Sequence, residues 1–196
     1  SDKGFRKGDL DNYKKLGAVD YNQGSMEWRM RNILVPCCWL MPSCQKVTVA
    51  ESRKESLALE ILLARHIFPR GYTVRIPKES YSWEQLKDLA FRDGEIPSIQ
   101  PPDAAINYMS HWIKSKTSGR KIITITLREC HSEQDRNSNL NEWAKFVNYL
   151  DKSIYYVVII RDIEKAFEKL PPAFQGCDIF NEAIWNLELR SALYQL

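Results

Sequence analysis

The sequence predicts an α/β fold: a Rossmann-like parallel sheet with flanking helices. Two runs of β-branched and aromatic residues, KIITITL at 121–127 and IYYVVII at 154–160, are typical of strands buried on both faces. Between them, apolar residues recur at helical spacing over 140–150. Strand, helix and strand at this separation form a βαβ unit, in which the two strands run parallel.

Length and composition limit the classes of protein. The chain has 196 residues, 44% of them hydrophobic and 27% charged, which is close to the average for globular proteins and excludes a disordered or collagen-like chain. The formal charge of +3 comes without a dense Lys/Arg run, so we expect no nucleic-acid partner. The most apolar stretch, 33–44, is too short for a transmembrane segment. Five cysteines, two of them adjacent, predict reduced thiols in a cytoplasmic protein.

The first half predicts a partial N-terminal α/β lobe over residues 1–100. A polar segment opens the chain, and 45–50 and 72–77 have the composition of strands. Helices are predicted over 51–68, ending at Pro69, and over 83–92, opened by a capping box from Ser82 to Gln85. Three prolines within 95–102 mark the boundary between the lobes.

The second half, 101–196, predicts a Rossmann-like C-terminal lobe that binds the donor. Asp103 is expected to cap a helix that ends at Gly119, and Ser138 or Asn139 to cap the crossover helix. After the second strand come a short helix, a two-proline break and a last helix over 181–195. That helix ought to lead to another strand. We therefore expect the sheet to be completed by a further segment beyond Leu196 or by a partner chain.

The loop 128–139 is the candidate site, because ligands of open α/β sheets bind outside the carboxyl ends of the strands. It offers arginines and a helix start, which together suit a phosphate, and three groups capable of proton transfer. These candidates are Arg128, Glu129, His131, Asp135, Arg136, Asn137, Ser138 and Asn139. The same composition is equally typical of a solvated loop whose arginines pair with nearby acids.

Other motifs carry less information. No glycine-rich phosphate loop occurs, which argues against a dinucleotide-dependent dehydrogenase and a P-loop NTPase. The cysteines lack zinc spacing, and Cys130 and His131 should point to opposite faces of an extended segment. Six tryptophans are spread along the chain and predict core or lobe-interface positions rather than a sugar-stacking platform.

Several short motifs resemble a known family. They are TITLREC, where a buried strand ends in an arginine; RNSN, which opens a helix; VVIIRD, a second strand ending near an acid; and FNEA, which begins a helix. With EWRMRNILVP and AESRKE upstream, they make most of the chain similar to bacterial glycosyltransferase-like proteins of the GT-B type, distantly related to fucosyltransferases.

The resemblance implies two lobes with a nucleotide-sugar donor between them and a glycan or other hydroxyl as acceptor. Arg128 would hold the donor diphosphate as it leaves, Arg136 would support it, and the helix start at Asn137, Ser138 and Asn139 would add N–H donors. Such stabilisation needs no metal and no further cofactor. The general base stays open between Glu129, His131 and Asp135.

Two other functions fit the same residues. One is a non-catalytic α/β binding or assembly module, whose loop arginines recognise a phosphate or carboxylate on a partner. The other is a different phosphate-handling enzyme, such as a phosphatase or nucleotide hydrolase. That enzyme would need clustered acids for metal, and the acids here are scattered.

Overall fold

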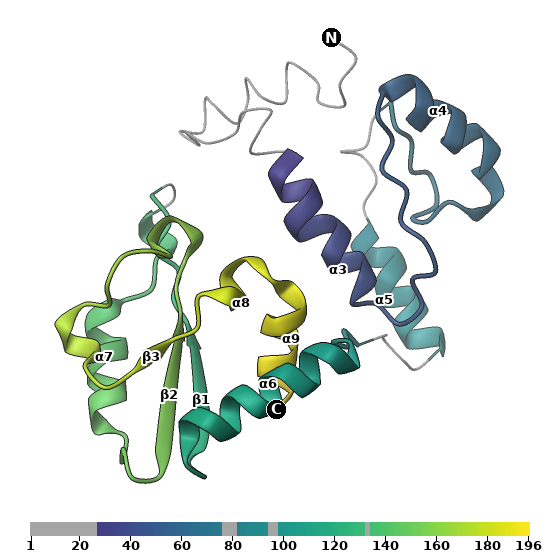
Figure 1. The fold of residues 1–196 in the computed structure, drawn as a ribbon. Helices are drawn as coiled ribbons and strands as arrows, with labels where there is room; N and C mark the ends of the chain where they lie inside the picture. The colour runs from purple at the N-terminus through teal and green to yellow at the C-terminus, as the bar shows by residue number, and fades with distance from the viewer. Residues whose placement is uncertain (1–26, 76–81, 94–97, 132–133) are drawn as a thin grey trace.

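The computed structural model describes residues 27–75, 82–93, 98–131 and 134–196 (Figure 1). A small parallel sheet of three strands, in the order β1-β2-β3, lies in the second half of the chain. Helices flank it, so the predicted α/β class is confirmed at the level of a parallel sheet with flanking helices. The polar segment at the start of the sequence lies outside the described residues.

The βαβ unit is the firmest agreement between sequence and structure. It consists of β1 (Lys121–Thr126), α7 (Leu140–Tyr149) and β2 (Tyr155–Ile160). The strands pair in parallel from Lys121 opposite Tyr155 to Thr126 opposite Ile160. The predicted ranges therefore differ from the observed ones by no more than a residue at each end.

The two predicted strands differ in burial. β2 is buried over almost its whole length, because apolar layers cover both of its faces and it lies between β1 and β3 (Asp178–Ile179). β1 is an edge strand among the described residues and is mostly half-buried, so its predicted burial on both faces is wrong. The Lys121 N–H bonds to the Ile154 carbonyl just before β2, and the Leu127 N–H bonds to the Ile160 carbonyl at its end. By the alternation of a parallel ladder, those of Ile122, Thr124 and Thr126 point away from it.

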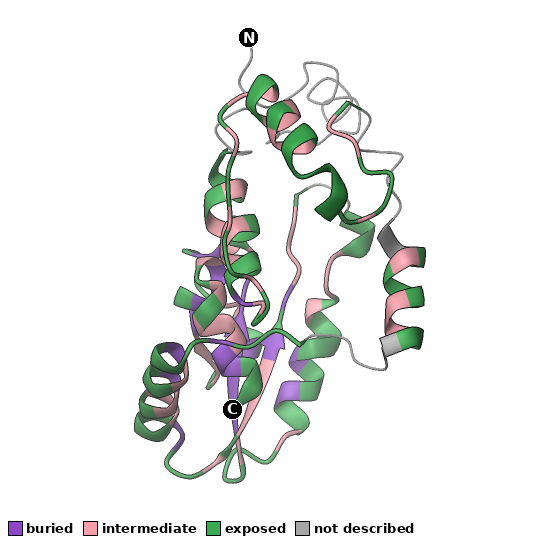
Figure 2. Cartoon of the chain, turned by 90° about the vertical axis from the view of Figure 1, so that its right-hand side faces the viewer, coloured by how far each residue is buried: buried purple, intermediate pink, exposed green. Residues whose placement is uncertain are grey.

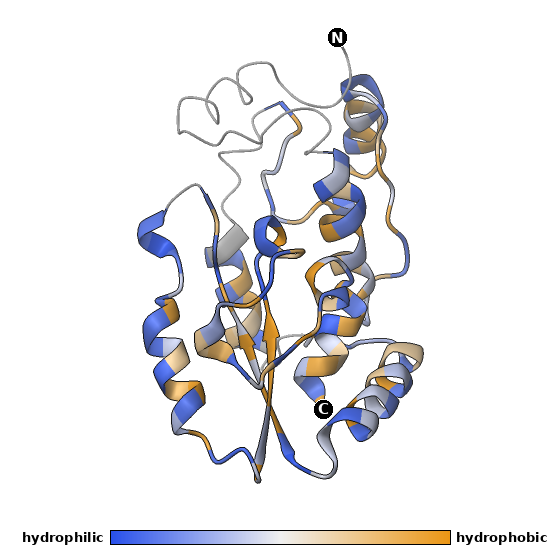
Figure 3. Ribbon diagram, turned by 60° about the vertical axis from the view of Figure 1, so that its left-hand side comes forward, coloured by the Kyte–Doolittle hydropathy of each residue, from blue (hydrophilic) through white to orange (hydrophobic). Residues whose placement is uncertain are grey.

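Side chains alternate between two apolar layers, one on each face of the sheet. On one face, α7 and the 3-10 turn η6 (Pro172–Phe174) pack against β1 and β2. On the other face lie three helices: α6 (Asp103–Thr117), α8 (Glu182–Trp185) and α9 (Leu187–Gln195). Figure 2 shows the buried residues gathered on the sheet and on the helix sides that face it, and Figure 3 shows the matching apolar strands.

The ends of two helices correct one prediction and bear out others. α6 begins at Asp103 itself after Pro102, and no side chain caps it, so the predicted Asp103 cap is wrong. An acid in the first turn still interacts favourably with the helix dipole. At the other end the backbone turns left-handed at Ser118 (φ 50°) and Gly119 (φ 83°), which confirms the predicted stop. For α7 the cap is Asn139, whose side chain accepts a bond from the Glu142 N–H.

The C-terminal region contains two features that the sequence did not predict. Instead of one last helix there are two, because Asn186 leaves the helical conformation and caps α9 through the Leu189 N–H. The strand β3 has only two residues, too few to show any periodicity. Asn186 is typical of an N-cap and was the available signal for the break.

The described part of the first half contains helices and turns but no strand. Its elements are η1 (Met30–Leu34), α3 (Val35–Trp39), α4 (Arg53–Leu62), η2 (Ala64–His66) and α5 (Ser82–Asp93). The predicted strand at 45–50 is wrong, and so is the described part, 72–75, of the one at 72–77. Side chains take the place of a partner strand, because Val74 receives a bond from Arg53 and donates one to Glu60. The helix predicted over 83–92 is confirmed as α5, whereas the Gln85 side chain bonds to the backbone of Arg70 and the predicted capping box stays a prediction.

A polar cluster ties β3 to its neighbours at the opposite end of the sheet from the loop 128–139. The buried Tyr156 hydroxyl donates to Asp178, and Lys116 of α6 lies 3.8 Å from the same carboxylate. The Arg120 guanidinium lies 4.7 Å from the centre of the Tyr156 ring. Burial, and then the bond to Asp178, raise the pKa of Tyr156 above its ordinary value.

This raised pKa predicts a loss of stability in alkali. Above about pH 10 the unfolded tyrosine releases its proton while the folded one keeps it, so the free energy of unfolding falls as pH rises. We expect Tyr156→Phe to cost about 1 kcal/mol at pH 7 through the lost hydrogen bond. Above pH 10 the variant should lose stability less steeply than the wild type, as measured by urea unfolding between pH 7 and 11. Equal slopes for the two proteins would contradict the assignment.

Candidate functional site

The candidate loop leaves β1 at its carboxyl end and is closed on itself by two reciprocal pairs of hydrogen bonds. The Arg128 N–H donates to Ser138 Oγ (2.9 Å), and the Ser138 N–H donates to the Arg128 carbonyl (2.8 Å). The Cys130 N–H donates to Asn137 Oδ1 (2.9 Å), and Asn137 Nδ2 donates to the Cys130 carbonyl (2.8 Å). Hydrogen bonds to the opposite arm of the loop therefore hold the backbone in place at Arg128 and at Cys130.

Three of the predicted phosphate ligands use their side chains to stabilise the loop and the start of α7. The side chains of Asn137 and Ser138 hold the first arm of the loop, and that of Asn139 caps α7. Their role towards a ligand stays a prediction. Arg136 is exposed in the 3-10 turn η4 (Gln134–Arg136), and Asp135 is exposed beside it.

Glu129 enters a buried ion pair with Arg161, the residue that follows β2. Arg161 Nε donates to one carboxylate oxygen (2.8 Å) and Nη2 to the other, and the side chains of Arg161 and Glu129 are only 3% and 8% exposed. The remaining Nη1 donates to the carbonyls of Glu168 and Lys169. Hydrogen bonding to Glu129 raises the pKa of Arg161, which keeps it charged.

This ion pair makes Glu129 the least available of the three candidate bases. Both oxygens of Glu129 are engaged, so accepting a further proton would require breaking the ion pair. The imidazole of His131 and the carboxylate of Asp135 lie on exposed residues and make no hydrogen bond within the described residues. Geometry thus favours His131 or Asp135 over Glu129. Arg161 was missing from the predicted site, although a charged residue directly after a buried apolar strand was an available signal.

Two acids after β2 bind the same loop from the other side. Asp162 accepts a bond from the Glu129 N–H (3.3 Å), and Glu164 accepts one from the His131 N–H (2.7 Å). The Cys130 thiol also donates to Glu164 (3.5 Å). Periodicity could not single out these acids, because their partners come from a different loop. Together the contacts join the two loops at the carboxyl edge of the sheet into one assembly.

A cavity of about 430 Å³, the edge cavity, lies in this assembly. Its volume is in the range of small-ligand sites. Arg128 and Lys165 line it together with the carboxylates of Glu129 and Glu164, and Arg161 neutralises the first of these. The other lining residues are Cys130, His131, Gln134, Asn137, Ser138 and Leu140. The edge cavity therefore brings five residues of the predicted site together, Arg128, Glu129, His131, Asn137 and Ser138, and leaves Asp135, Arg136 and Asn139 outside its lining.

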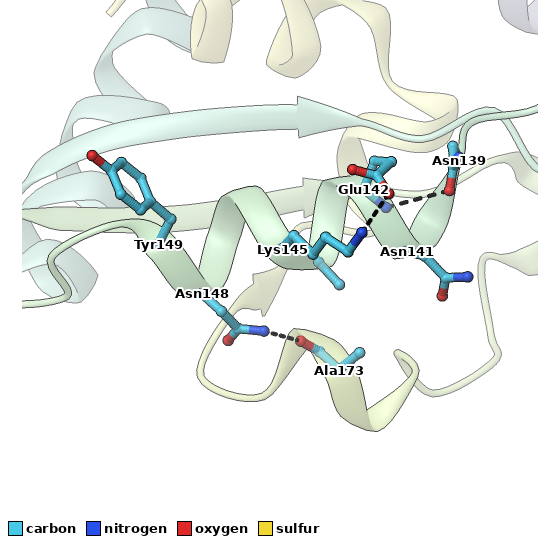
Figure 4. Close-up of a pocket in the computed structure, with 8 residues that line it drawn as sticks. Asn139, Asn141, Glu142, Lys145, Asn148, Tyr149 and Ala173 are labelled. Atoms are coloured by element: carbon cyan, nitrogen blue, oxygen red, sulfur yellow. Dashed lines mark hydrogen bonds and ion pairs between the residues drawn. The ribbon is translucent and has the colours of Figure 1, made fainter.

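A larger hollow of about 740 Å³ runs along α7 beside η6 (Figure 4). Its charged groups, Lys145 and Glu142, pair with each other at 2.7 Å, and Asn148 donates to the Ala173 carbonyl. Of the predicted site residues, it contains only Asn139. We therefore regard the smaller edge cavity as the better candidate, since it holds charges from two loops.

Neither a metal site nor a membrane-spanning helix occurs in the described part of the chain. No group of three or more histidine, cysteine or acidic side chains converges there as a metal site would require. None of the described helices combines the length and the apolar character needed to cross a membrane. Comparisons of the chain with protein-family models, with curated proteins and with solved structures gave no match.

Proposed function

We propose that the chain acts in a glycosyltransferase-like protein of the GT-B type, which transfers a sugar from a nucleotide-sugar donor to an acceptor hydroxyl. In this proposal residues 1–100 belong to one lobe and residues 101–196 to the donor-binding lobe. The donor diphosphate lies at the carboxyl edge of the sheet, against the loop that follows β1. Residues alone stabilise the leaving group, without a metal ion.

The observation that carries the proposal is the fixed position of Arg128. It follows the buried Leu127 at the end of β1, its backbone bonds both ways to Ser138, and its side chain lines the edge cavity. A guanidinium offers a planar fork of donors that matches two phosphate oxygens. Because its backbone is already held in place, little reorganisation is needed when charge develops on the phosphate.

The surroundings of Arg128 support the same chemistry. The N–H groups in the first turn of α7 lack partners within the helix and carry its positive dipole end. Arg136 adds a second cation to the same loop. As the bond from the sugar to the diphosphate breaks, negative charge grows on the diphosphate, and these groups stabilise it. The acceptor hydroxyl must lose a proton, for which His131 is better placed than the paired Glu129, since His131 lines the edge cavity and Asp135 lies outside its lining.

A panel of nucleoside diphosphates tests the proposal by thermal shift. At a hundred times its Kd, a bound diphosphate should stabilise the folded state by about 2.7 kcal/mol. Arg128→Ala should abolish the shift, measured against the variant's own melting temperature, and Arg128→Lys should keep only part of it. The matched control is Arg65→Ala in η2, an exposed arginine distant from the edge cavity in sequence, which should leave the shift unchanged. No shift with any nucleotide would overturn the proposal.

A second function is favoured by one specific contact. Glu129 is paired with Arg161, so the loop keeps its cations but has one fewer candidate base. Such a loop suits a binding or assembly module that recognises a phosphate or carboxylate on a partner. Incubation with nucleotide-sugar donors separates the two. An enzyme releases nucleoside diphosphate, detectable by chromatography, whereas a module binds a phosphorylated peptide saturably and consumes no donor.

A further inference from the structure

A third hollow, of about 450 Å³, lies between the N-terminal helical segment and the junction of α8 with α9, and we name it the tryptophan hollow. One wall is a helical face with residues at i, i+3, i+4 and i+8, and the other is the turn around Asn186. The lining residues are Trp28, Arg31, Asn32, Pro36, Trp185, Asn186, Leu187 and Glu188. It shares no residue with the edge cavity.

Two tryptophans from distant parts of the chain, Trp28 and Trp185, line this hollow. Trp28 is 36% exposed, which is high for so large an apolar side chain. Trp185 is held in place by Phe167, whose ring stacks on it with centroids 5.4 Å apart and planes 29° apart. The sequence prediction, which found no sugar-stacking platform among the scattered tryptophans, missed this pair because their proximity depends on tertiary structure.

The polar groups around the indoles include both donors and acceptors. Within the described residues, the Arg31 guanidinium and the Glu188 carboxylate make no hydrogen bond or ion pair. Asn32 uses its amide nitrogen on the Trp28 carbonyl (2.8 Å), which leaves its side-chain oxygen as an acceptor. Asn186 uses its oxygen on the Leu189 N–H (3.0 Å), which leaves its side-chain nitrogen as a donor. Arg31 adds donors and Glu188 adds acceptors.

We infer that the tryptophan hollow binds a sugar ring of a neutral glycan. A pyranose has C–H groups on its faces, which suit the negative face of an indole, and hydroxyls on its rim, each both donor and acceptor. The mixed rim matches hydroxyls better than a phosphate, because the Glu188 carboxylate would repel an anion. The volume is in the range of small-ligand sites. If the proposed function holds, on which this assignment of role rests, the bound sugar is the acceptor.

The test titrates the full chain with neutral trisaccharides built from glucose, galactose or N-acetylglucosamine. Binding is followed by tryptophan fluorescence and by saturation-transfer NMR. We expect at least one trisaccharide to bind saturably and Trp28→Ala to weaken it about tenfold, the size expected for losing a central aromatic anchor. Trp39→Ala is the matched control, since this tryptophan of α3 is exposed and does not line the hollow. It should bind like the wild type.

A second variant guards against misfolding. Glu188→Gln keeps the shape of the side chain and should still weaken sugar binding several-fold, because the carboxylate accepts stronger hydrogen bonds than an amide. The inference is overturned if no trisaccharide binds, if Trp28→Ala and Glu188→Gln both bind like the wild type, or if nucleosides compete for the same site. The diphosphate shift, measured in parallel, separates the two claims. Sugar binding without a diphosphate shift supports the sugar site in the tryptophan hollow and overturns the proposed function. A diphosphate shift without sugar binding supports the proposed function and overturns the sugar site.

Discussion

Replacing Arg161 with alanine is expected to lower the free energy of unfolding by about 3–5 kcal/mol, the cost of breaking a buried ion pair by removing one partner. The change leaves the Glu129 carboxylate buried without its counter-ion, and it also removes the donors to the carbonyls of Glu168 and Lys169. Urea unfolding followed by circular dichroism measures the loss. We expect a lower midpoint with an unchanged m-value, since the surface exposed on unfolding stays similar.

Two further variants show whether burial is the cause. Lys145→Ala removes an exposed ion pair, with Glu142 on the surface of α7, and it should cost less than 1 kcal/mol. Replacing Glu129 and Arg161 together by methionine removes both charges, so this double variant should be more stable than Arg161→Ala. If Arg161→Ala costs no more than Lys145→Ala, the ion pair does not hold the two loops together.

Phe180→Ala is expected to cost about 3–5 kcal/mol, as large-to-small changes of buried aromatic residues do. Phe180 is 1% exposed, its ring centroid lies 4.9 Å from that of Trp112, and its N–H bonds to the Ile159 carbonyl. It therefore joins β2 to α6 just after β3. The cavity left by the ring would have apolar walls from both elements, so water would not fill it. We therefore expect a lower unfolding midpoint in urea.

The control for this prediction is another phenylalanine. Phe91 of α5 is 87% exposed, and truncating it should change the free energy of unfolding by less than about 0.5 kcal/mol, as surface changes usually do. Similar losses for Phe180→Ala and Phe91→Ala would contradict the described core. A loss confined to Phe180→Ala would place the main core on the face of the sheet that carries α6.

The elements that the sequence predicted best are those whose conformation follows from a local pattern of residues. The apolar stripe of α7, with Ala144 and Val147 buried, and the continuous apolar run of β2 are both readable from spacing alone. The segment 45–50 has the composition of a strand but no partner among the described residues, and a strand needs one for its backbone bonds. Composition could not reveal that missing partner.

The same distinction applies to the candidate site. That a basic loop follows β1 was predictable, because strand ends and charged residues are visible in one sequence. Which acids and bases meet was not, because Arg161 pairs with Glu129 across two loops and Glu164 reaches His131 in the same way. Likewise, Trp28 and Trp185 meet only after the helices have packed. Contacts between distant segments are a property of the fold, and one sequence carries no direct record of them.

The outward N–H groups of β1 give this strand an uneven tolerance to substitution. At Thr124 the backbone N–H is not used in the ladder. Proline, which has no N–H, would therefore remove no hydrogen bond to β2 at this position. At Ile123 the same change would remove one. Backbone-altering substitutions should therefore be accepted or rejected with a period of two residues along β1. Where both neighbours pair with the central strand β2, its successive N–H groups bond in turn to one neighbour and to the other. In that part of β2 no position should accept proline.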